Sequence, residues 1–233
     1  MAEILKADGS GEMFNQIAKR YDLLNRIISM GLDQSWRKQL IDSMPKTGKI
    51  LDLATGTADV AISIAKQNPN VQITGLDPSI GMLEVGIEKV KKLALASRIT
   101  LLEGSALEMP FEAESFDGIC VAFGIRNFAD RLKGLKEMAR VTRKGGVIAI
   151  LELSEPRENG LLSPFVKFHV HHVVPFLGAL LSGHAEYRYL QKSVAAFPAP
   201  ELFAQMMQEA GLVDVQIFRM TFGVAHLYVA KVG

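Results

Sequence analysis

Two aspartates stand where short apolar segments end, and their positions suit the binding of a nucleotide. Asp52 lies in the segment 50–54, which runs into a turn of small residues around Gly56, and Asp77 ends a second apolar segment, 71–76. A carboxylate at the carboxyl end of a strand can accept hydrogen bonds from two ribose hydroxyls. Small turn residues let the backbone approach a ligand closely. This spacing predicts the opening of a nucleotide-binding α/β unit.

The turn differs from the dinucleotide fingerprint G-x-G-x-x-G, because it contains one glycine, Gly56, flanked by Ala54 and Ala58. NAD is therefore not the expected ligand. An acid at position 52 followed by x-small-x-Gly-x-small resembles the turn of class I S-adenosylmethionine (SAM) methyltransferases, with Asp52 and Gly56 beside the cofactor. A tight strand-to-helix turn in any α/β domain is the alternative at this point.

Further polar residues follow two later apolar segments. Ser105 comes after segment 99–103 and could accept a hydrogen bond from an adenine amino group. Met82 and Leu83, just past Asp77, could wall an adenine ring, but ordinary core packing is the favoured interpretation of both. Arg126 and Asn127 come after segment 116–122. The planar donor fork of an arginine suits an anionic substrate oxygen, with a surface salt bridge as the alternative.

Apolar segments alternate with helix-like segments along the chain, which predicts a parallel sheet with right-handed crossovers. The expected strands are 50–54, 71–76, 99–103, 116–122, 147–153, 213–219 and 224–231. The expected helices are 59–67, 80–95, 131–142 and 201–210, with Ser79 and Asp130 as caps. Residues 13–40 also read as helical, interrupted at Gly31, with Asp33 as a cap for the second part. An apolar segment, 161–183, interrupts the alternation.

Composition limits the class of protein. The 233 residues carry 26 basic and 25 acidic side chains, so no basic surface indicates a nucleic-acid partner. Cys120 is the single cysteine, which excludes an internal disulfide and indicates a buried thiol in a reducing, cytoplasmic setting. No run of about 18 apolar residues predicts a membrane-spanning helix.

Several segments together resemble the menaquinone/ubiquinone biosynthesis C-methyltransferase family: 13–25, 31–37, 123–127, 151–156, 187–190 with Ser193, 197–198, 206–207 and 210–211. The resemblance implies one α/β domain, 1–233, with the Rossmann-like class I methyltransferase fold. It implies a seven-stranded, mostly parallel sheet with helices on both faces and an antiparallel final strand. It also implies an N-terminal helical cap at about 13–44 and an apolar helical insertion at about 158–195.

The resemblance implies SAM-dependent C-methylation of the ring of a polyprenylated quinol, with demethylmenaquinol to menaquinol as the first expectation. Carried over by position, the cofactor residues are Thr57, Asp77, Ser105 and Ala106. The chain departs from the family at Ser105, in the insertion and at Tyr228, which leaves the identity of the quinone open. Two alternatives remain: a small-molecule O- or C-methyltransferase of secondary metabolism, and a non-catalytic SAM-binding scaffold of a quinone-biosynthesis complex.

Ring methylation requires an ionised ring hydroxyl, and Arg126 is the candidate for stabilising it. Tyr21 and Asn127 are the candidate substrate-binding residues. The proton acceptor stays open among a water molecule, Tyr21 and His169. The sequence predicts no metal site, because no cysteine or carboxylate completes a ligand set with His169, His171 and His172.

The apolar insertion suits a prenyl tail. Phe165, Phe168 and their apolar neighbours predict an entrance that touches the membrane surface transiently. The expected location is the cytoplasm, with peripheral attachment at the inner face of the membrane. A lid that completes the core, or a homodimer contact, is the alternative for this segment.

Overall fold

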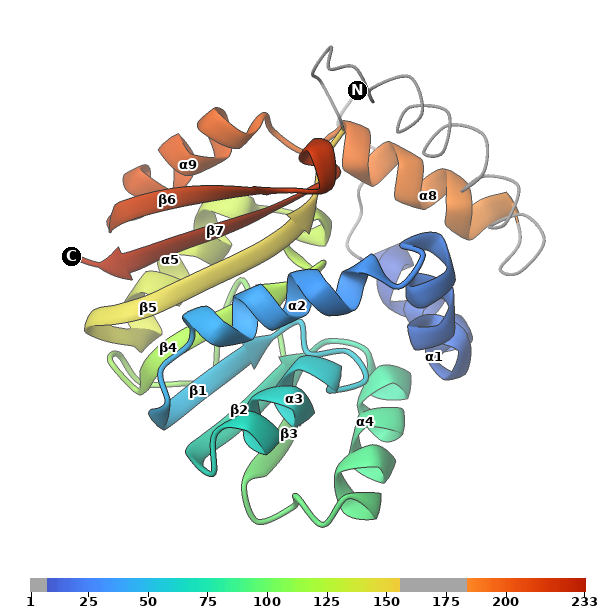
Figure 1. The fold of residues 1–233 in the computed structure, drawn as a ribbon, viewed down its shortest axis with the longest axis horizontal. Coiled ribbons are helices and arrows are strands. Elements are labelled where there is room, and N and C mark those ends of the chain that lie inside the picture. The colour runs from blue at the N-terminus through green and yellow to red at the C-terminus, as the bar shows by residue number, and fades with distance from the viewer. Residues whose placement is uncertain (1–7, 156–183) are drawn as a thin grey trace.

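The computed structural model of the chain describes residues 8–155 and 184–233. Within them, seven strands form one sheet in the order β3-β2-β1-β4-β5-β7-β6 (Figure 1). The strands are β1 (Thr47–Leu53), β2 (Asn70–Asp77), β3 (Ile99–Glu103), β4 (Phe116–Ala122), β5 (Thr142–Leu153), β6 (Leu212–Met220) and β7 (Ala225–Val232). The predicted strands are confirmed, with their ends shifted by up to three residues except at β5, which begins five residues earlier than predicted.

The direction of the strands confirms the predicted fold class. β1 pairs in parallel with β2 and β4, β2 with β3, and β4 with β5. β7 runs antiparallel to both of its neighbours, β5 and β6. The parallel strands therefore end at one edge of the sheet, and the strand order reverses between β1 and β4, where α/β proteins bind ligands.

Helices cover both faces of the sheet (Figure 1). They are α1 (Asp8–Ile28), α2 (Leu32–Ser43), α3 (Asp59–Gln67), α4 (Ile80–Lys92), α5 (Arg131–Val141), α8 (His184–Ala195) and α9 (Pro200–Glu209). Neighbouring strand residues serve opposite faces, as the two-residue strand period requires. Ile50 packs in a cluster with Leu40 of α2, whereas Leu51 packs with Leu135 of α5. Burial of each such side chain contributes about 1.5–3 kcal/mol.

Of the three predicted helix caps, Ser79 and Asp130 form the expected hydrogen bonds and Asp33 does not. The Ser79 hydroxyl accepts from the Met82 amide at 3.3 Å, and the Asp130 carboxylate accepts from the Lys133 amide at 2.9 Å. Both predicted caps are confirmed. Asp33 is not the cap, because it lies inside the first turn of α2 and the cap is Gly31, two residues earlier, at φ +79°. A left-handed conformation there favours glycine.

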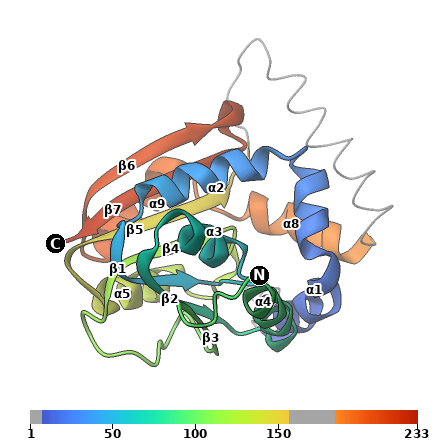
Figure 2. The same cartoon turned by 60° about the horizontal axis from the view of Figure 1, so that its bottom comes forward.

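The helices α1 and α8 lie beyond the carboxyl ends of the strands, as both views show (Figures 1 and 2). Residues 156–183, which hold most of the predicted insertion with Phe165, Phe168 and His169, lie outside the described residues. No helix in the described ranges is long and apolar enough to cross a membrane.

Candidate functional site

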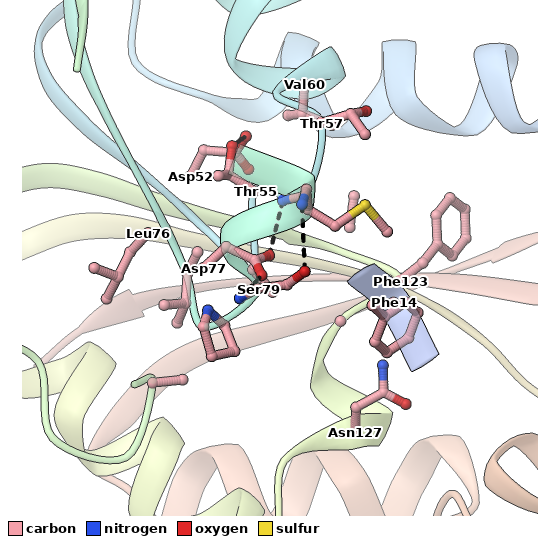
Figure 3. A pocket seen from close by; sticks show the side chains of 18 of the residues that line it. Phe14, Asp52, Thr55, Thr57, Val60, Leu76, Asp77, Ser79, Phe123 and Asn127 are labelled. Atoms are coloured by element: carbon pink, nitrogen blue, oxygen red, sulfur yellow. Dashed lines mark hydrogen bonds between the residues drawn. The ribbon is translucent and has the colours of Figure 1, made fainter. Parts of the chain in front are cut away.

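A pocket of about 200 Å³ opens at the carboxyl ends of four neighbouring strands. Its lining comes from the ends of β3, β2, β1 and β4 and from α1 and α2. Figure 3 shows Asp77 and Ser79 on one side of it and Phe14 and Phe123 on the other. All eight residues predicted to bind cofactor or substrate line this pocket: Tyr21, Asp52, Gly56, Thr57, Asp77, Ser105, Ala106 and Asn127.

The turn after β1 has an unusual backbone. Ala54, Gly56 and Ala58 all have positive φ, at 55°, 54° and 65°. Alanine in this conformation costs free energy, and such strain tends to occur at ligand sites. A Cβ on Gly124 would lie 2.5 Å from the Cβ of Ala54, so glycine lets the loop after β4 pack against this turn. The small-residue pattern in the sequence thus reflects both the turn and its neighbour.

Asp77 holds the turn from the next strand. Its two carboxylate oxygens accept hydrogen bonds from the amides of Gly56, at 2.8 Å, and Ser79, at 2.9 Å. Burial raises the pKa of Asp77, and these two hydrogen bonds oppose that rise. An ionised carboxylate accepts about four hydrogen bonds, so Asp77 keeps capacity for two hydroxyl donors. The carboxylate can therefore bind a ribose diol while it holds the turn.

Asp52 lies deeper, at the base of the pocket. Its Oδ2 accepts from the Thr55 hydroxyl at 2.6 Å and from the Ala61 amide at 3.1 Å. The thiol of buried Cys120 lies 3.5 Å from its Oδ1. Burial raises the pKa of Asp52 to about 6, although these donors and the charge of Arg37 act against the rise. Asp52 thus fastens the turn to the start of α3 and places a carboxylate in the pocket.

Two residues of α1 bond to elements that line the pocket. The Asn15 Oδ1 accepts from the Ser79 hydroxyl at 2.7 Å and from the Gly81 amide at 2.9 Å. The Asp22 carboxylate accepts from the Thr57 hydroxyl at 2.6 Å and from Lys89 at 2.7 Å. The predicted cofactor residue Thr57 therefore also joins α1 to the turn.

Aromatic rings gather at the end of the pocket next to α8. Phe14 packs edge-on against Tyr21 and Tyr189, with centroids 6.0 and 6.4 Å apart. The Tyr189 hydroxyl donates to the Asn127 Oδ1 at 3.0 Å. Tyr21 and Asn127, the predicted substrate residues, thus share a wall that is aromatic with one amide. Such a wall suits a flat ring that carries hydroxyl groups.

Arg126 is buried and bonded to Glu152 of β5. Its Nη1 lies 2.8 Å from the Glu152 Oε1 and also donates to the Phe123 carbonyl. Burial, the largest single influence, lowers the pKa of Arg126, but the charge and hydrogen bond of Glu152 together with Tyr21 and Tyr189 outweigh burial, so the pKa is raised. Arg126 is not among the described residues that line the pocket, whereas its neighbour Asn127 is. A catalytic role for Arg126 stays a prediction.

Of the remaining predicted residues, some lie where they were expected and others lie outside the described residues. Ser105 and Ala106 lie at the pocket end formed by β3, and the Ser105 Oγ accepts from the Leu107 amide at 3.1 Å. Met82 lines the pocket as well, whereas Leu83 is buried and is not among the described residues that line it. Cys120 is fully buried, as predicted. The three histidines 169, 171 and 172 lie outside the described residues.

Sequence reasoning missed Asn15, Asp22, Arg37 and Glu152. Asp22 and Lys89 are 67 residues apart, and no local pattern connects them. Glu152 did carry a signal, because it is an acid within the apolar run of β5 and such an acid requires a buried partner. Arg37 lies one residue after Trp36 on the predicted second helix, where its direction depends on how that helix packs.

Comparisons with known proteins agree with this geometry. The chain matches the ubiE/COQ5 methyltransferase family over residues 3–231. It is 43% identical to the ubiquinone/menaquinone biosynthesis C-methyltransferase UbiE of Geotalea daltonii, over 97% of each chain. It is 42% identical to the demethylmenaquinone methyltransferase of Deinococcus radiodurans, over 96% of this chain and 92% of the other.

Solved structures share the fold at much lower identity. A phosphoethanolamine N-methyltransferase 2 of Haemonchus contortus in complex with SAM superposes with a TM-score of 0.67 at 17% identity. The match covers 94% of this chain and 60% of the other. At this identity, the likeness concerns the fold alone.

The raised pKa of Asp52 predicts a pH-dependent stability. Because folding raises this pKa from 3.8 to about 6, the folded protein keeps a proton that the unfolded chain releases in that interval. The free energy of unfolding should therefore lose roughly 3 kcal/mol from Asp52 as pH rises from about 4 to above 6. We expect Asp52→Asn to lack this loss.

The measurement is urea unfolding of both proteins at several pH values. The difference between them isolates Asp52, since all other groups titrate in both. Equal pH slopes for the wild type and the variant would show that Asp52 does not titrate in this range.

Proposed function

The chain belongs to the ubiE/COQ5 methyltransferase family, and we propose that this SAM-dependent methyltransferase methylates a ring carbon of a polyprenylated quinol, demethylmenaquinol first. The observation that carries the proposal is one continuous pocket, with Asp77 at one end and an aromatic wall with Asn127 at the other. The first end suits a ribose and the second a hydroxylated ring. The near full-length match to the family supports the same assignment.

The residues at the strand ends fit SAM. Ser105 and Ala106 lie where an adenine would be held, Asp77 where its ribose would be held, and Gly56 lets the backbone come close. The free accepting capacity of Asp77 matches the two ribose hydroxyls. When bound, SAM supplies a methyl group on a sulfonium, which is a permanent cation and an effective methyl donor.

The aromatic wall would orient the acceptor. Phe14, Tyr21 and Phe123 present ring edges and faces to the pocket, and Asn127 presents an amide that Tyr189 orients. A quinol ring held by these groups would place one carbon against the donor. Such alignment converts an encounter in solution into a reaction between positioned groups, which accounts for much of the acceleration by enzymes.

The protein must also make the ring nucleophilic. A phenol has a pKa near 10, so its ionisation at neutral pH costs roughly 4 kcal/mol. We propose that the field of Arg126 favours the ionised ring, with Tyr21 within its electrostatic reach. Arginine itself is too basic to accept the proton. Water or a side chain, with Tyr21 and His169 as candidates, would accept it.

The apolar segment 161–183 is the proposed binding segment for the prenyl tail. The apolar residues of 161–183, Phe165 and Phe168 among them, would receive the tail and touch the membrane surface transiently. The protein would then act in the cytoplasm and attach peripherally at the inner face of the membrane. A homodimer contact through the same segment is the competing proposal. The domain organisation proposed is a single domain, 1–233.

Methyl transfer to demethylmenaquinol tests the function directly. Incubation with methyl-labelled SAM and the reduced, prenylated substrate should place the label on a ring carbon, as tandem mass spectrometry of the product would show. Label on a ring oxygen would indicate an O-methyltransferase. Binding of SAM without any transfer to quinols would indicate the scaffold alternative.

Removal of the ribose acceptor should weaken cofactor binding. Asp77→Ala should cost about 1.5–3 kcal/mol of SAM binding energy, the range for hydrogen bonds to a charged group. Calorimetric titration measures this change. The control is Glu103→Ala, because Glu103 pairs with Asp77 in the β2–β3 register and is exposed. Similar SAM affinities for the two variants would mean that other groups hold the ribose.

The role of Arg126 can be separated from its ion pair. Arg126→Gln should lower single-turnover methyl transfer about 100-fold or more, the scale for one electrostatic stabiliser, with SAM affinity little changed. Glu152→Gln keeps the cation and should retain most of the rate. Each variant breaks a buried pair at a cost of about 3–5 kcal/mol, so circular dichroism must first establish that it is folded. Equal rate losses in the two variants would assign Arg126 a positioning role instead.

A further inference from the structure

Arg37 is a basic side chain in a pocket that is otherwise acidic. Among the described residues that line the pocket, it is the one lysine or arginine, beside the four aspartates 22, 52, 59 and 77. It comes from α2, and its guanidinium carbon lies 5.2 Å from the centroid of the Phe123 ring. This stacking holds the cation over the end of β4.

One donor of Arg37 is left over by the described residues. Within the described part of the chain, the buried Nε of Arg37 has no hydrogen-bond partner. It forms an ion pair with the Asp33 Oδ2 of the same helix, but the 3.6 Å between these two atoms is too long for a hydrogen bond. Asp33 in turn accepts from the Ser29 hydroxyl at 2.9 Å. A buried donor without a partner is costly, so a ligand that accepts from Arg37 would recover that cost.

Three of the four aspartates that line the pocket already have a partner or a role. Lys89 binds Asp22 at 2.7 Å and Asp59 at 2.5 Å. Asp77 holds the turn and keeps capacity for the ribose. Asp52 and Arg37 remain, a carboxylate and a cation, and the two charges lie within electrostatic reach of each other. This pair complements a ligand end that carries one ammonium and one carboxylate.

SAM has such an end. Its adenine and ribose, placed at β3 and β2, leave the amino-acid tail to run toward β1 and β4, where Asp52 and Phe123 lie. We propose that Arg37 binds the α-carboxylate of that tail. The proposal rests on the SAM-dependent activity above and deepens it, since it names the cofactor atom that Arg37 recognises. A quinol oxygen, also an anion when ionised, is the other possible acceptor.

Two ligands separate the tail from the rest of the cofactor. S-adenosylhomocysteine carries the amino-acid tail, whereas 5′-methylthioadenosine lacks it. Arg37→Gln should weaken S-adenosylhomocysteine binding about 10- to 100-fold, the scale for hydrogen bonds to a charged group, and leave 5′-methylthioadenosine binding unchanged. Arg37→Lys should restore part of the affinity, because a point charge replaces a planar fork.

The matched control is Lys38→Gln. Lys38 is the next residue of α2, is exposed and pairs with Asp42 at 2.5 Å. The variant therefore removes one positive charge from the same helix, at a position outside the pocket. Calorimetric titration of both ligands into all four proteins gives the result without any methyl transfer. The result is therefore independent of whether a quinol is the acceptor.

Two outcomes of the titration would overturn the proposal. Equal losses for both ligands in Arg37→Gln would indicate a structural role for the Arg37 ion pair and stacking. Unchanged affinity for both ligands would show that Arg37 does not bind the amino-acid tail; a separate assay of methyl transfer with a raised KM for the quinol would then assign the contact to the substrate oxygen.

Discussion

The site depends on two carboxylates that are held out of water beside a strained turn. Asp52 and Asp77 end neighbouring strands, and both are nearly fully buried. Burial of a charge is costly unless donors surround it, and here the turn supplies Gly56 and Thr55 and the start of α3 supplies Ala61. The carboxylates therefore need the turn as much as the turn needs them. This mutual dependence keeps positive φ at Ala54 and Ala58, where alanine alone would relax.

The N-terminal helix α1 is coupled to the same turn. Lys89 of α4 binds Asp22 of α1 and Asp59 of α3, and it also donates to the Thr57 carbonyl. One ammonium with three donors thus joins three helices around the pocket. Asn15 adds a second link, to the first turn of α4. Any movement of α1 would therefore be transmitted to residues that line the cofactor end of the pocket.

Arg126 has a structural role through its hydrogen bonds, and its ion pair with Glu152 also carries an electric field. Its bonds to Glu152 and to the Phe123 carbonyl hold the short 3₁₀ segment Ile125–Asn127 that presents Asn127 to the pocket. A buried pair is neutral overall, but its two charges point in fixed directions, so a nearby ring can still experience a field. Arg37, by contrast, has no carboxylate within hydrogen-bond distance among the residues that the structure describes. The two arginines thus differ in how much of their charge a ligand can use.

The sequence by itself determined the strands, most of the helices, the turn and the two acids at the strand ends, because each depends on neighbours within a few residues; α8 was not among the helices expected from local patterns. Alternating burial, Ser79 and Asp130 as caps, and small residues around Gly56 are local signals. The tertiary structure alone decided the partners. It brought Glu152 to Arg126, Asp22 to Thr57 and Lys89, and Arg37 over Phe123, across separations that no periodicity encodes. The physical reason is that α1 and α2 pack against elements distant in the chain, and only that packing sets the direction of their polar side chains.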